Sequence, residues 1–297
     1  MEALLFGVGA ALAFGFGDYA AAIASRRAGV AVTALGMQIL GLGAVAIVIA
    51  ALGRWPQFAW SQVPWAFTLA VIGTLSLVAL YRAFALGPIA VVSPVVASYA
   101  ALSVIGIVVF LGERLTSGQA VAIAVTFVGV VVASTDIRRL PRTLGRATLA
   151  PLAKQGPLPL GVRIGALATI GFGIWSVILS AATRANDPFA LVMVWRVFGI
   201  ALVALYIASR RTSLAPLAVP ATLAMVALVG VLDTGAIVLL MLGIESGFAS
   251  FVMTGSGAYP LIPAVLAILV LRERLAPNQY AGVAILLAGL IALGLQG

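Results

Sequence analysis

Three ionisable side chains stand inside long apolar stretches of this chain: Asp18, Arg196 and Asp233. A charge at the centre of a membrane costs about 3 kcal/mol or more, so such residues usually face a cavity or a charged partner. Carboxylate and guanidinium groups can bind a charged solute, exchange protons or pair with each other. A membrane enzyme would need clustered carboxylates, a metal motif or an activated nucleophile at one membrane face, and the sequence shows no such cluster. We therefore expect these residues to border a solute pathway in a protein that is not an enzyme, with a structural ion pair as the alternative.

The depth of each charge indicates which residues can pair. At ~1.5 Å per residue, Arg196 lies about 12 Å from one membrane face, and Asp233 lies in the same half of the membrane. Asp18 lies in the other half, at about the depth of Gln38, which stands 158 residues before Arg196. We predict two polar layers: Arg196 with Asp233 toward the outside, and Gln38 with Asp18 toward the inside.

Polar aromatic and small residues deep in the apolar stretches complete the candidate site. Buried Tyr and Trp side chains carry a polar atom that needs a partner, which suits them to line a cavity. Methionine supplies adaptable apolar contacts, and small residues before a proline leave backbone carbonyls open to a ligand. The remaining candidate substrate-binding residues are Tyr99, Trp175, Ser176, Trp195, Met253, Ser256 and Tyr259. Tight helix packing is the alternative interpretation of these positions.

The composition indicates that lipid is the solvent of this protein. Hydrophobic residues make up 63% of the chain and charged residues 8%, against roughly 25% charged in a typical soluble domain. Mean hydropathy is +1.22. The chain has no Cys and no His, which excludes disulfides, thiol nucleophiles and Cys/His zinc sites. We expect no cofactor and no metal. The net charge of +9 belongs to Lys and Arg at the ends of apolar runs, so we expect membrane anchoring and no nucleic-acid partner.

The apolar runs predict ten spans of about 20 residues, the length that crosses ~30 Å of hydrocarbon. They fall at 3–24, 31–52, 63–81, 90–111, 116–135, 161–183, 188–208, 218–241, 248–271 and 276–296. A basic, proline-rich break separates two groups of five. The sequence therefore predicts an all-α integral membrane protein with a first five-helix repeat at 1–135, a linker at 136–160 and a second five-helix repeat at 161–297.

A short phrase occurs twice, 160 residues apart, and supports this division. Leu111-Gly112-Glu113-Arg114-Leu115, with Gln119 and Gly129, recurs as Leu271-Arg272-Glu273-Arg274-Leu275, with Gln279 and Gly289. Such a period indicates one structural unit built twice. Five is an odd number, so the second unit enters the membrane from the opposite side, and the repeat is inverted. Glu113 and Glu273 occupy turns, where we expect them to cap helix ends and fix the short hairpins.

The basic residues are distributed unequally between the two sides of the predicted membrane. One side holds Arg26, Arg27, Arg82, Arg138, Arg139, Arg142, Arg146, Lys154, Arg163, Arg210, Arg211, Arg272 and Arg274, and the other holds Arg54, Arg114 and Arg184. Because the richer side is normally cytoplasmic, we expect the linker in the cytoplasm and both termini outside.

Several of these motifs resemble one family. Gly112-Glu113-Arg114-Leu115 with Gln119 and Gly129, its second copy, the stretch from Tyr81 to Gly87 and Pro260 are similar to the EamA family of the drug/metabolite transporter superfamily. The first half departs from the family pattern at Ala100, which stands where a proline would match Pro260. The resemblance covers nearly the whole chain, and its motifs are specific for family and fold but not for substrate.

The resemblance implies a ten-helix carrier in the bacterial cytoplasmic membrane that works by alternating access. The implied activity is export of small metabolites, with neutral and aromatic amino acids favoured, as in the YddG-type exporters. Multidrug export and nucleoside or purine export are the alternatives within the superfamily. A membrane-embedded lipid-modifying enzyme and a channel are the alternatives outside it. The expected partners are a small-molecule substrate and the lipid bilayer, with the protein as a monomer or homodimer.

Overall fold

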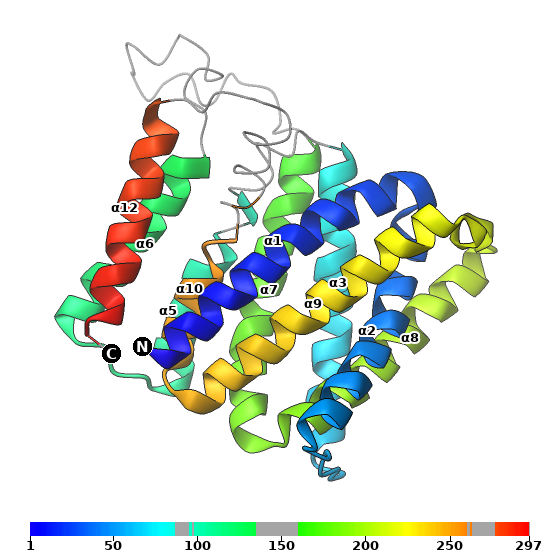
Figure 1. Ribbon diagram of the computed structural model, residues 1–297, viewed down its shortest axis with the longest axis horizontal. Helices are drawn as coiled ribbons and strands as arrows, with labels where there is room; N and C mark the ends of the chain where they lie inside the picture. Colours follow the sequence, from blue (N-terminus) through cyan, green and yellow to red (C-terminus); the bar gives the residue numbers. More distant parts are fainter. Residues whose placement is uncertain (87–94, 97, 135–159, 260–261, 263–276, 297) are drawn as a thin grey trace.

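The computed structural model describes residues 1–86, 95–96, 98–134, 160–259, 262 and 277–296. All regular structure in these ranges is helical (Figure 1). Six of the described helices are long and apolar enough to cross a membrane. They are α1 (Glu2–Ala28), α2 (Val30–Leu52), α3 (Gln62–Leu86), α7 (Leu160–Ala185), α8 (Pro188–Arg210) and α9 (Pro220–Ser246). The chain is therefore a multi-pass membrane protein.

Shorter helices complete the described part of the chain. They are α5 (Tyr99–Leu111), α6 (Ser117–Ser134), α10 (Ala249–Ser256), α12 (Pro277–Gly294) and the 3₁₀ turn η3 (Ala215–Ala218). The spans predicted at 90–111 and 248–271 are described only in part, because α5 begins at Tyr99 and α10 ends at Ser256. Pro260, Glu273 and the linker lie outside the described residues. The prediction of ten spans therefore remains a prediction.

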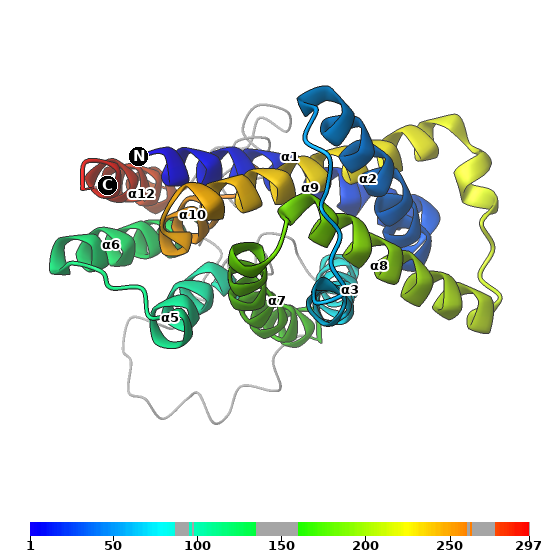
Figure 2. The ribbon, with the colours of Figure 1, turned by 90° about the horizontal axis from the view of Figure 1, so that it is seen from below.

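Helix bounds recur along the chain at the offsets seen in the sequence. Shifting α2 by 158 residues gives the bounds of α8, and shifting α6 by 160 gives those of α12. The packing of helices follows the same offset. α1 packs along α9, and α3 packs along α7. Because α7 is the shifted counterpart of α1 and α9 that of α3, the two packed pairs correspond to each other. Figure 1 shows α1 and α9 side by side, crossing α3 and α7 obliquely. Figure 2 shows α6 and α12 at one end of the molecule and α8 at the other.

The α6–α12 pair is held together by the two glycines of the repeated phrase. A Cβ added to Gly129 would lie 2.5 Å from Leu286 Cα, and one added to Gly289 would lie 2.7 Å from the Thr126 backbone nitrogen. Leu286 follows Thr126 by the same 160 residues that separate the glycines, so the two contacts are equivalent. Small residues let membrane helices approach backbone to backbone. This close approach explains why both copies of the phrase keep a glycine at this position.

Gly129→Ala should destabilise the protein by about 1–3 kcal/mol, because the new methyl group overlaps the α12 backbone. Gly43→Ala is the matched control in α2, since nothing lies within 4 Å of a Cβ built there. Alanine is the better helix former by about 1 kcal/mol, so Gly43→Ala should be neutral or stabilising. Thermal unfolding in detergent measures both variants. Equal melting temperatures would contradict the close contact.

Candidate functional site

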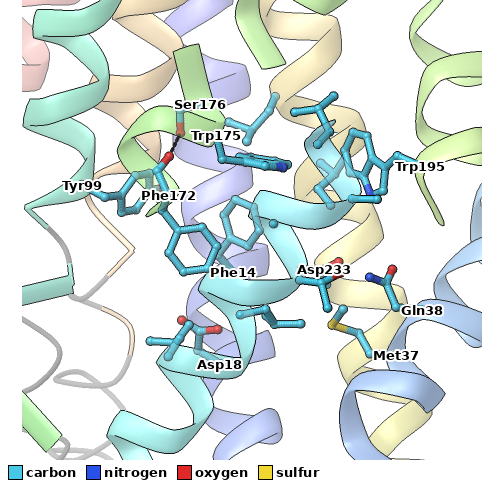
Figure 3. A pocket seen from close by; sticks show the side chains of 18 of the residues that line it. Phe14, Asp18, Met37, Gln38, Tyr99, Phe172, Trp175, Ser176, Trp195 and Asp233 are labelled. Atoms are coloured by element: carbon cyan, nitrogen blue, oxygen red, sulfur yellow. Dashed lines mark hydrogen bonds between the residues drawn. The ribbon is translucent and has the colours of Figure 1, made fainter. Parts of the chain in front are cut away.

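A pocket lies among helices from both sides of the linker. Its empty volume is about 820 Å³ with the open mouth included. The wall contains Phe14, Asp18, Met37, Gln38, Leu69, Ala70, Gly73, Thr74, Leu77, Leu80, Val96, Tyr99, Phe172, Trp175, Ser176, Trp195, Arg196, Asp233, Ile237, Leu240 and Tyr259. Figure 3 shows Asp18 and Asp233 on different parts of this wall, together with the rings of Phe172 and Trp175. The pocket therefore combines a mainly apolar, aromatic lining with a few charged groups.

Arg196 is the most enclosed charge in the pocket, with a side chain that is 1% exposed. Its Nη2 donates to Asp233 Oδ2 at 2.6 Å and to Thr234 Oγ1 at 3.0 Å, and its Nη1 donates to Gln38 Oε1 at 2.8 Å. The predicted pairing of Arg196 with Asp233 is confirmed. A buried guanidinium with this many partners is held in one geometry, because losing any partner would leave a costly unpaired group.

The predicted second layer, Gln38 with Asp18, is wrong. Gln38 belongs to the Arg196 cluster instead, and the two residues stand at the 158-residue offset at which helix bounds recur. The depth estimate assumed straight helices along the membrane normal. Membrane helices tilt by about 20° on average, and the long Arg and Gln side chains extend toward each other, so residues at different estimated depths can meet. Gln38 and Arg196 are thus two residues at the 158-residue offset that contact each other.

Asp18 is left without a polar partner. No hydrogen bond or ion pair joins its carboxylate to another of the residues that the structure describes, although it lines the same pocket as Arg196. The side chain is only partly buried, because it faces the cavity. An unpaired carboxylate inside a membrane protein is costly and is usually retained for binding an ion, a proton or a solute. Asp18 is therefore the charged group of the pocket that is free to act.

Aromatic rings form a continuous part of the pocket wall. Trp175 and Trp195 meet edge to face with centroids 5.6 Å apart. The ring of Tyr99 lies 5.9 Å from that of Phe172 and 6.1 Å from that of Tyr259, and the last two tyrosines are 160 residues apart. Such clusters bury flat apolar groups, and their ring faces attract cations. The wall thus suits a ligand that is flat and apolar over most of its surface.

Two buried hydroxyl groups on the pocket wall lack a hydrogen-bond partner. They are Thr74 Oγ1 and Tyr259 Oη, on residues that are 8% and 4% exposed. Unpaired buried polar atoms are uncommon in folded proteins, because each costs about 1–3 kcal/mol. Both oxygen atoms are closed to solvent in this conformation, so a solute bonds to them only after a movement of the wall exposes them.

Most of the predicted site residues lie together on the pocket wall, and two do not. Met253 and Ser256 are fully buried in α10, where Met253 packs in the apolar core and Ser256 lies 3.5 Å from Tyr99 Oη. The sequence interpretation missed Phe14, Met37, Thr74 and Phe172. A usable signal existed for Phe14 and Phe172, since Phe14-Gly15 and Phe172-Gly173 match at the 158-residue offset. Thr74 and Met37 carry no such signal.

Glu113 caps a helix, but a different helix from the one predicted. Its carboxylate accepts hydrogen bonds from the Ala249 and Ser250 backbone nitrogens, at 2.8 and 3.1 Å, and so caps the start of α10. Arg184 at the end of α7 completes the cluster through an ion pair with Glu113. A carboxylate at a helix N-terminus satisfies free N–H groups and is favoured by the helix dipole. The cluster therefore ties the α5–α6 turn to two elements that follow the linker.

Gln119, the other polar residue of the phrase, stabilises the start of α6. Its side chain accepts from the Thr116 backbone nitrogen at 2.9 Å, while its own backbone nitrogen donates to Thr116 Oγ1 at 3.2 Å. This reciprocal pair is a capping box. Within the described ranges, no group of three or more metal-binding side chains comes together. Glu113 and Gln119 therefore serve the fold.

A family model and a solved structure are both similar to this chain. The family model of the EamA-like transporter family matches residues 1–135 and again residues 159–295. A solved structure described as "Crystal structure of protein" is 19% identical, with a TM-score of 0.73, over 99% of this chain and 96% of that one. At this identity, the likeness concerns the fold alone. No protein of curated function matches the sequence.

Proposed function

Because the chain belongs to the EamA-like transporter family of the drug/metabolite transporter superfamily, we propose that it exports a small amphipathic metabolite by alternating access. The observation that carries this proposal is the pocket, which draws its wall from helices before and after the linker and combines aromatic rings with Asp18. A site between two halves can be exposed to one side of the membrane and then to the other as the halves rock.

The repeated geometry supports two inverted halves of five spans each. Helix bounds recur at a constant offset, and corresponding residues touch each other at Gln38–Arg196 and Tyr99–Tyr259. A twofold axis between the halves would bring residues at corresponding positions into contact with each other in this way. Both ends of the chain lie at the same end of the molecule (Figure 1), as an even number of crossings requires. The bacterial cytoplasmic membrane, with the linker inside, is the setting that fits the basic residues.

The expected substrates carry a flat or branched apolar part and an amino group. Neutral and aromatic amino acids, as handled by YddG-type exporters, are the candidates that the family resemblance favours. The aromatic wall suits the side chains of these amino acids, and Asp18 suits their ammonium group. Organic cations, the substrates of multidrug carriers, are the second candidate class, because they need no group to hold a carboxylate. Nucleosides and purines are a third class, for which the wall supplies stacking surfaces.

Counterflow in liposomes tests the proposal. Vesicles that hold the purified protein and an excess of unlabelled solute should accumulate labelled solute transiently and saturably for at least one member of a panel of amino acids, amines, nucleosides and cationic drugs. Trp175→Ala should reduce the rate by about tenfold or more, because it removes an aromatic ring of the pocket wall on which the solute would pack. Trp60→Ala is the matched control, since Trp60 is 82% exposed outside the pocket.

The same vesicles separate the alternatives. Single-channel currents without trans-stimulation would indicate a channel and overturn the carrier proposal. Counterflow that is unchanged by an imposed pH gradient would indicate facilitated diffusion, while acceleration by the gradient would indicate proton coupling. Absence of counterflow for every class of solute, in protein that still unfolds cooperatively, would overturn the proposed function.

A further inference from the structure

The charges of the pocket do not balance, and the imbalance indicates which solutes fit. The wall carries two carboxylates, Asp18 and Asp233, and one guanidinium, Arg196. Arg196 is paired with Asp233, so among the described wall residues an ionised Asp18 carries the uncompensated charge. A partner for this charge must be cationic, because a second negative group would add repulsion where solvent screening is weak.

The described part of the pocket wall offers no free cation that could compensate Asp18, because Arg196 is already paired with Asp233. The chain has one Lys, at position 154 in the linker, and no His. The segments 87–98 and 257–271, which adjoin the pocket residues Tyr99 and Tyr259, contain no charged residue. Since the described wall supplies no free cation, a cation that balances Asp18 comes with the solute or, as a proton, from water.

Arg196 is also closed to a substrate carboxylate. Both Nη atoms already donate to protein acceptors, and Asp233 holds the guanidinium at 2.6 Å. Nε has no partner and Nη1 keeps a second hydrogen, but the Arg196 side chain is only 1% exposed, so neither donor is open to a solute in this conformation. A carboxylate could pair with Arg196 only if the wall opened around the guanidinium or Asp233 were displaced, and displacement would leave the Asp233 carboxylate unpaired at a cost of several kcal/mol. The zwitterion of an amino acid thus finds a site for its ammonium group and none for its carboxylate.

The rest of the wall favours a cation with an aromatic body. Ring faces attract an ammonium group and stack on a flat apolar one, and both kinds of contact are available from Trp175, Tyr99 and Phe172. The hydroxyls of Thr74 and Tyr259 have no partner among the described residues, so once a movement of the wall exposes them they can accept or donate a hydrogen bond without breaking an existing one. A neutral ring with one ammonium group satisfies all of these features.

We propose that the pocket selects aromatic monoamines that lack a carboxylate, with the ammonium group on Asp18, over the corresponding amino acids and acids. This proposal rests on the proposed transport function and narrows its substrate class. Such an amine is the product of decarboxylation of the corresponding amino acid.

Two matched ligand series test the selection: tryptamine, tryptophan and indole-3-propionate, and phenethylamine, phenylalanine and 3-phenylpropionate. Each is added at equal concentrations to the purified full chain, and the shift in melting temperature reports binding to the native state. The amine should stabilise most, the amino acid less and the acid least. Asp18→Asn should weaken amine binding by at least about tenfold, which equals about 1.4 kcal/mol, and should remove the preference for the amine.

Asp187→Asn is the matched control, because asparagine can keep the α8 cap that Asp187 makes with the Ala190 nitrogen outside the pocket. Stabilisation of the wild-type protein by tryptophan or the acid as strongly as by tryptamine would overturn the selection, whether or not Asp18→Asn folds. If neither series binds while another solute shows counterflow, the amine proposal fails and the transport function stands. Failure of all solutes in counterflow is the separate result that removes the transport function.

Discussion

Arg196→Met should destabilise the protein by about 3–5 kcal/mol, the usual cost of removing one partner of a buried ion pair. The substitution preserves much of the side-chain volume but leaves Asp233, Gln38 and Thr234 without their shared donor. Arg196→Lys should also be destabilising, because a single ammonium group cannot reproduce the planar fork that reaches three acceptors. Unfolding in detergent by heat or denaturant measures the loss.

The control for this prediction is Arg27→Met, an exposed arginine in the last turn of α1. A surface change of this kind normally alters stability by no more than about 0.5 kcal/mol. The double variant Arg196→Met with Asp233→Leu should be more stable than Arg196→Met alone, because it removes the stranded carboxylate as well. If the double variant were less stable by the full sum of the single losses, Arg196 and Asp233 would be energetically independent and the pair would not act as a unit.

Glu113→Ala should cost about 3 kcal/mol, because one carboxylate serves three donors. The Ala249 and Ser250 nitrogens at the start of α10 would lose their acceptor, and Arg184 would lose its counter-charge. The Glu113 side chain is 5% exposed, so water cannot fully replace these contacts. Glu113→Gln keeps a carbonyl acceptor for one N–H group and should lose less than the alanine variant. Denaturant unfolding of the purified protein gives both values.

Glu245 provides a matched control for Glu113 on the same side of the molecule. It also pairs with an arginine across the linker, Arg54, at 2.9 Å, but the two side chains are 31% and 44% exposed. Exposed pairs usually contribute no more than about 1 kcal/mol, so Glu245→Ala should have a small effect. Equal losses for the two alanine variants would show that the capping hydrogen bonds of Glu113 add nothing to its ion pair.

The spans and the central ion pair could be predicted because they follow from local chemistry. Apolar runs of the length of a membrane crossing give α1, α2 and α7–α9 directly. Isolated charges in such runs must find partners or a cavity, and this requirement identified Asp18, Arg196 and Asp233. The offset of the repeated phrase likewise predicted that corresponding residues would have related surroundings.

The partners of long side chains could not be predicted in the same way. Gln38 joins Arg196 and not Asp18, because helix tilt and side-chain reach change the depths counted along a straight helix. The Glu113 carboxylate accepts a hydrogen bond from the start of α10, and this contact depends on how segments far apart in the sequence pack together. Thr74 and Met37 reach the pocket through the rotation of their helices, which an almost uniformly apolar span does not encode.

The cap on α10 has a consequence for the order of synthesis. Glu113 lies 136 residues before Ala249, so it is inserted with the early spans, long before the backbone nitrogens that it satisfies have been translated. Until α7 and α10 arrive, its charge must stay in contact with water or lipid headgroups. The end of the molecule at which Glu113 meets α10 thus matures only after α10 has been translated, and residues 1–135 produced as a separate polypeptide would expose an anionic, protease-accessible turn that the 297-residue chain conceals.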